Sequence, residues 1–177
     1  MAQEVRAELG LRPVDPLDPL RLAAHLDIPV IPLSALKGDA PEVFRHFSRT
    51  DRSAFSAITV FSGPRRVIVH NDSHSAGRQN SNVAHELSHG LLLHPPRPPL
   101  DGYGNRDWDS NQELEADWLA GVLLVPDEAA ILIVRRELPS PVAAEVYGVS
   151  ERMMTFRLNM SGARLRVQRA ARYGGAD

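Results

Sequence analysis

The chain has 177 residues, of which 43% are hydrophobic and 24% charged, a composition typical of a soluble globular protein of one domain. It contains no cysteine, which excludes disulfides and thiolate metal ligands, so a metal site would have to use histidine and carboxylate. No apolar run approaches the roughly 18 residues that a membrane span needs. Because residues 1–4 also lack the basic and apolar parts of a secretory signal, we expect a cytoplasmic protein with no membrane partner.

The formal net charge of −2 conceals two oppositely charged stretches. Residues 101–128 contain eight acids and one arginine, whereas residues 152–172 contain six arginines and no acid. Acids near a cation site are expected to bind or surround the cation. A basic stretch can meet nucleic acid, although a solvated helix face is the commoner explanation. Lys37 is the sole lysine beside nineteen arginines, a bias that indicates a GC-rich bacterial genome.

In chain order, the pattern first predicts two short helices and a strand. The first helix covers residues 2–10. The second covers residues 15–27, which begin with aspartates that can cap a helix and prolines that suit its first turn. Residues 28–33 are β-branched but contain two prolines, so we expect at best an edge strand. Residues 34–54 have no clear pattern.

The rest of the chain predicts a β-hairpin followed only by helices. Residues 54–61 and 66–70 form the two strands, separated by the turn residues Ser62-Gly63-Pro64-Arg65. Helices follow at residues 75–93, where several prolines end the pattern, at 109–125, and in three or four pieces over 127–172. The fold class predicted from this order is α+β.

The most informative motif is His85-Glu86-Leu87-Ser88-His89, an H-E-x-x-H run inside the helix at 75–93. Two histidines four residues apart share one helical face, so both imidazoles can bind the same metal ion. Glu86 lies beside them and is free to handle a proton. The alternative is that both histidines are ordinary surface residues.

A catalytic zinc usually has three protein ligands and one open position, so a third ligand is needed from a nearby element. The acidic helix at 109–125 supplies Glu113 and Asp117, which are four residues apart on one face. Glu113 can bind the metal while Asp117 accepts the second N–H of a ligand histidine. Glu115 points elsewhere, and we expect it to be solvated. The alternative is an ordinary amphipathic helix with its acids facing solvent.

Three stretches resemble the ImmA/IrrE-type metallopeptidases. Residues 77–94, which contain the H-E-x-x-H run, resemble the core of that family. Glu113-x-x-Ala116-Asp117-x-Leu119-Ala120-x-x-Leu123-Leu124-x-Pro126 matches the family's second signature in order and spacing, and Asp15-Pro16-Leu17-Asp18-Pro19-Leu20-x-Leu22-Ala23 is similar to its N-terminal helix. The resemblance covers most of residues 15–160. It implies a minimal zincin-like fold, in which a small antiparallel or mixed sheet packs on the two active-site helices, and a glutamate ligand at Glu113.

These residues predict the chemistry of a zinc endopeptidase. A metal held by His85, His89 and Glu113 would activate a water and polarise a scissile carbonyl, while Glu86 takes the proton. A further donor should stabilise the transition state, and the candidates are His94, Tyr103 and His74. Zinc is the expected ion, although manganese fits two histidines and one glutamate nearly as well.

The C-terminal third has a helix-turn-helix sequence pattern, in which Gly148 ends one helix and Ser150 caps the next. We expect residues 139–172 to be a helical extension packed on the protease core, because the second helix carries much apolar surface. A DNA-binding role for this segment is the alternative.

Resemblance to the family implies a protein substrate, namely a helix-turn-helix repressor of phage, mobile-element or stress genes that is encoded nearby. A different class of function is a metal-binding regulator or toxin–antitoxin component that acts without proteolysis. We expect no direct contact with nucleic acid in the leading hypothesis.

Overall fold

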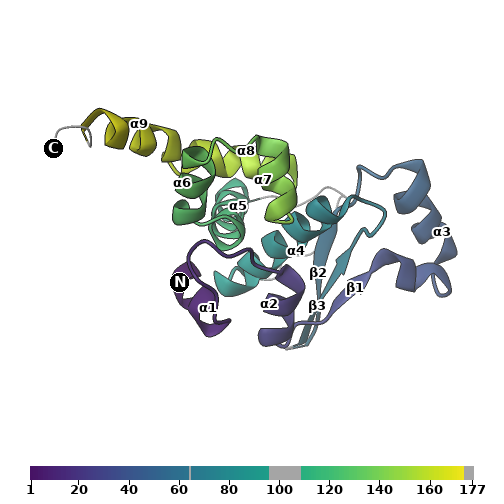
Figure 1. The fold of residues 1–177 in the computed structure, drawn as a ribbon. Helices are drawn as coiled ribbons and strands as arrows, with labels where there is room; N and C mark the ends of the chain where they lie inside the picture. Colours follow the sequence, from purple (N-terminus) through teal and green to yellow (C-terminus); the bar gives the residue numbers. More distant parts are fainter. Residues whose placement is uncertain (64, 96–108, 174–177) are drawn as a thin grey trace.

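The computed structural model describes residues 1–63, 65–95 and 109–173, and every structural statement below refers to these residues. The elements follow in the order α1 (Ala2–Glu8), α2 (Pro19–His25), β1 (Val30–Pro32), η1 (Leu33–Lys37), α3 (Pro41–Arg45), η2 (His46–Thr50), β2 (Ala57–Ser62), β3 (Arg65–His70), α4 (Ala76–Leu91), α5 (Ser110–Leu124), α6 (Asp127–Arg135), α7 (Ser140–Val146), α8 (Glu151–Met160) and α9 (Ala163–Tyr173). The fold is α+β: a small sheet with α4 beside it, and a mostly helical C-terminal part beyond α5 (Figure 1).

The sheet of the described residues is mixed, with the strand order β1-β3-β2. β2 and β3 form the antiparallel hairpin that the sequence predicts, with Thr59 opposite Ile68. β1 runs parallel to β3 and is an edge strand, as its prolines require. Because β3 is central, β2 forms the other edge of the sheet.

Helix α4 lies between the sheet and α5, and it contacts β2, β3, α2 and α5 (Figure 1). Val83, Ala84 and Leu87 form its fully buried face. His85 and His89 are half-buried, at the edge of this face. The apolar spacing of α4 therefore places the H-E-x-x-H residues at the border of the core, where side chains can reach both solvent and α5.

Capping side chains fix where several helices begin. The carboxylate of Asp18 accepts a hydrogen bond from the backbone N–H of Leu20 at the start of α2. Asp109 does the same for two N–H groups of α5, and the hydroxyl of Ser150 accepts from Met153 N in α8. Each cap satisfies an N–H that the helix itself leaves unpaired.

The C-terminal helices are tied to α4 by part-buried hydrogen bonds, and α8 also contacts α5. The amide of Asn80 donates to the Gly148 carbonyl at 2.8 Å, and Ser150 N donates to Ser81 Oγ at 3.0 Å. Gly148 has a φ of +60°, which ends α7 as the sequence predicts. One face of α8 is buried in the common core through Met153, Met154 and Leu158.

Arg157 of α8 is fully buried and joins α8 to the junction of α5 and α6. Its Nε donates to the Val125 carbonyl at 2.8 Å, and its Nη2 lies 2.7 Å from Asp127 Oδ1. The guanidinium also lies over the ring of Trp118. Within the described ranges, no helix is both long and apolar enough to cross a membrane.

Candidate metal centre

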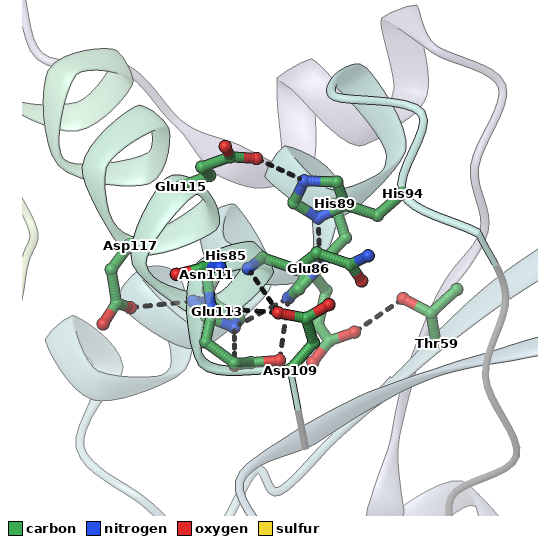
Figure 2. A network of polar contacts seen from close by, with 11 residues as sticks. Thr59, His85, Glu86, His89, His94, Asp109, Asn111, Glu113, Glu115 and Asp117 are labelled. Atoms are coloured by element: carbon green, nitrogen blue, oxygen red, sulfur yellow. Dashed lines mark hydrogen bonds and ion pairs between the residues drawn. The ribbon is translucent and has the colours of Figure 1, made fainter. Parts of the chain in front are cut away.

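Three side chains from two helices meet at the border of the core. His85 and His89 lie one turn apart on α4, with their Nε2 atoms 3.1 Å apart. Glu113, in the first turn of α5, has its Oε2 3.2 Å from His85 Nε2 and its Oε1 3.5 Å from His89 Nε2. One ligand atom of each residue lies within 4.8 Å of the other two. The structure thus brings together the three residues that the sequence predicts as ligands (Figure 2).

Asp117 lies on the far side of His85. Its Oδ1 is 2.8 Å from Nδ1 of His85, and this ring nitrogen faces away from Glu113 (Figure 2). A carboxylate can only accept here, so Nδ1 of His85 carries a proton and donates it. This is the contact that the sequence predicts for Asp117, and it leaves Nε2 of His85 pointing into the cluster.

The acids of the cluster hold a proton on His85 in the metal-free protein. Burial lowers the pKa of His85, but the hydrogen bonds to Asp117 and Glu113 outweigh it and raise this pKa to about 10. Burial and the neighbouring charge of His85 lower the pKa of His89 to about 4. The hydrogen bond from His85 also lowers the pKa values of Glu113 and Asp117. A cation that binds this cluster therefore replaces one proton held on His85.

Glu86 points toward the sheet and not toward Asp117. Its Oε2 accepts a 2.6 Å hydrogen bond from the hydroxyl of Thr59 on β2 (Figure 2). Burial raises the pKa of Glu86 above that of an ordinary glutamate. A higher pKa suits a carboxylate that takes a proton and releases it again. No sequence motif points to Thr59 as a partner of Glu86. The one clue in the sequence is that its hydroxyl lies on the inward face of β2, between Ala57 and Phe61.

His94 and Glu115 extend the cluster on the side of His89. Nδ1 of His94 is 2.8 Å from Nδ1 of His89, and Nε2 of His94 is 3.1 Å from Oε2 of Glu115. The Glu115 side chain is largely exposed, as the sequence predicts, but it has a specific partner. A role for His94 in stabilising a transition state stays a prediction, because both of its ring nitrogens already have partners in this structure.

These residues line a cleft with a volume of about 550 Å³. Its walls come from β2, α4, the first turns of α5 and the start of α8; the lining includes Thr59, Asn82, Met153 and Phe156. The amide nitrogen of Asn82 is buried and has no hydrogen-bond partner among the described residues. His74 does not line the cleft, because its Nε2 bonds the Arg52 carbonyl at 2.7 Å. Tyr103 lies outside the described residues.

The donor set of the cluster fits a divalent transition metal. Two imidazole nitrogens and a carboxylate, without thiolate, suit zinc or manganese. The hydrogen bond of His85 to Asp117 leaves its Nε2 free for a metal once the extra proton leaves. All three residues line the cleft, so a metal held by them would be within reach of water or substrate.

Helices that carry an H-E-x-x-H pair and a glutamate on an α+β core define a zincin-like protein, and a family comparison agrees. The family model described as the IrrE N-terminal-like domain, a peptidase family, matches residues 23–159. The chain therefore belongs to this metallopeptidase family, and α9 lies beyond the matched range. Comparisons with curated proteins and with solved structures gave no match.

Proposed function

We propose that the chain is a zinc-dependent endopeptidase in which His85, His89 and Glu113 hold the metal. The observation that carries this proposal is the convergence of both Nε2 atoms and the Glu113 carboxylate within 4.8 Å at an open cleft. When bound, zinc would activate a water and polarise the carbonyl of the substrate. We further propose that the protein acts in the bacterial cytoplasm as one domain, with residues 139–172 packed on the core.

Glu86 is the proton carrier of this proposal. Its Oε2 accepts a hydrogen bond from Thr59, which would hold the carboxylate in place to take a proton from water and deliver it to the leaving amine. Burial raises the pKa of Glu86 toward the range where both transfers are efficient. Asn82, whose amide nitrogen is buried and unpaired among the described residues, lies in the wall of the cleft.

An extended peptide fits the cleft along β2. This strand pairs with β3 on one side only among the described residues, and Ala57, Ile58, Thr59 and Phe61 line the cleft. The free edge of a strand can add an extended peptide through backbone hydrogen bonds. We propose that the peptide is a segment of a helix-turn-helix repressor encoded beside this gene, whose cleavage would switch on phage, mobile-element or stress genes.

Substitution of Glu86 with Gln tests the enzyme hypothesis. The zinc-loaded wild type should cleave the neighbouring repressor at one bond, visible by mass spectrometry, whereas Glu86→Gln should retain zinc and lose cleavage. If Glu86→Gln keeps the biological function, the protein acts as a metal-binding regulator instead. Salt-sensitive binding of the isolated chain to duplex DNA would favour the DNA-binding hypothesis.

A further inference from the structure

His94 contacts the outer side of His89, away from the candidate cation site. The contact joins the two Nδ1 atoms at 2.8 Å, whereas Nε2 of His89 faces His85 and Glu113. The His94 side chain is only 8% exposed, so solvent hardly competes for this contact. His94, which also lines the cleft, is thus placed to orient His89 from the side opposite Nε2 (Figure 2).

The backbone also fixes His94 over His89. The N–H of His94 donates to the His89 carbonyl at 3.0 Å, and the N–H of Leu93 donates to the Gly90 carbonyl at 3.2 Å. These two bonds are the Schellman pattern that ends a helix. The left-handed residue of this motif is Leu93, with a φ of +55°, where glycine would be less strained. The turn that ends α4 therefore folds the chain back so that His94 lies against His89 of the metal cluster.

When His89 binds a cation, the hydrogen bonds among His89, His94 and Glu115 permit one arrangement of protons. If His89 binds a cation through Nε2, its proton is on Nδ1 and is donated to Nδ1 of His94. Nδ1 of His94 must then accept, so its own proton is on Nε2. That nitrogen donates to Oε2 of Glu115 at 3.1 Å. Every donor meets an acceptor, and the chain ends on an exposed carboxylate of α5.

We propose that His94 and Glu115 are a positioning pair for the metal centre. They hold His89 in the tautomer and ring orientation that present Nε2 to the metal, just as Asp117 holds His85. Glu115 and Asp117 are two residues apart on α5 and face different ways, so each supports a different histidine. This inference rests on the ligands of the proposed function but not on peptidase activity.

The test is the zinc affinity of the purified full chain, measured by competition with a chromophoric chelator. We expect His94→Leu to weaken zinc binding about 10- to 100-fold, as the loss of such a partner typically does. Glu115→Gln should weaken it less, and the double variant should be no worse than His94→Leu alone. His94→Asn places an amide oxygen near the Nδ1 position and should recover part of the zinc affinity. In the His94→Asn background, adding Glu115→Gln should lower the zinc affinity no further.

A matched control pair is present far from the metal cluster. His25 of α2 and Glu8 of α1 form a contact of 3.0 Å between the same atom types, and neither residue touches a ligand histidine. His25→Leu and Glu8→Gln should therefore leave the zinc affinity unchanged. Circular dichroism and urea unfolding of the metal-free variants show whether each one is folded.

Three outcomes decide the inference. It is wrong if His94→Leu and Glu115→Gln bind zinc within twofold of the control variants, or if they lower only the stability of the metal-free protein. Because Glu115 is exposed, Glu115→Gln keeps the test valid even if His94→Leu does not fold. A wild type that binds zinc no better than His85→Leu would overturn the metal centre together with this inference. Tight zinc binding without repressor cleavage would count against the proposed function alone.

Discussion

The hydroxyl of Thr59 donates a 2.6 Å hydrogen bond to Oε2 of Glu86, which connects the edge strand of the cleft to the proposed proton carrier. Thr59 lies on β2, and Glu86 lies on α4 between the two candidate ligand histidines. The contact fixes the orientation of the carboxylate beside the cleft. Strand and helix therefore have to pack in this register for Glu86 to be aimed into the cleft.

Thr59→Val should lower kcat for repressor cleavage about 10-fold while KM changes little. The substitution keeps the shape of the side chain and removes one hydrogen bond to a charged group, worth about 1.5–3 kcal/mol, and a factor of 10 in rate corresponds to about 1.4 kcal/mol. Initial rates at saturating substrate would measure the effect. Thr59→Ser, which keeps the hydroxyl, is the control, and an undiminished kcat for Thr59→Val would show that the contact is dispensable.

Zinc binding should release about one proton at pH 6. In the metal-free protein, His85 is protonated because its pKa is raised to about 10, whereas His89 is neutral because its pKa is lowered to about 4. A metal that takes Nε2 of His85 must displace that proton, so zinc affinity should rise as the pH rises between these two values. Calorimetry in buffers with different ionisation enthalpies counts the protons. If zinc binding released no proton, His85 would have to be neutral before the metal binds.

Gly77→Ala should destabilise the fold by about 1–3 kcal/mol, as overpacking of a tight contact does. A Cβ at this position would lie 2.3 Å from the carbonyl oxygen of Val149, a backbone atom that cannot move aside alone. Intrinsic helix propensity predicts the opposite, a gain of about 1 kcal/mol. Urea unfolding distinguishes the two. Gly38→Ala, at the end of η1 and with nothing within 4 Å of its Cβ, is the control without a clash.

Arg157→Met should lower the free energy of unfolding by about 3 kcal/mol, because a buried charged donor is removed from its acceptors. The Val125 carbonyl and Asp127 both lose their hydrogen bond to the buried guanidinium. Arg166 contacts the same aspartate at 3.5 Å but is exposed, so Arg166→Met should cost at most about 1 kcal/mol. Equal losses in urea unfolding for the two variants would contradict a special role of the buried guanidinium.

Local sequence patterns predicted most elements of this fold. The hairpin, α4, α5 and the α7–α8 turn were found because alternation, helical spacing, caps and glycine act within a few residues of each other. Residues 34–54 were not placed. They form η1, α3 and η2, three segments of five residues each, and elements this short leave no periodic pattern to detect.

In the candidate metal centre, too, some features follow from local sequence patterns and others only from the tertiary structure. The H-E-x-x-H pair and the Glu113–Asp117 spacing are periodicities of single helices, so the sequence by itself determined which side chains share a face. Thr59, 27 residues from Glu86, and Glu115, 21 residues from His94, became partners only in the structure. Their contacts depend on how β2 packs on α4 and how α4 meets α5. No local residue spacing predicts such contacts, because they join side chains of elements that are distant in sequence.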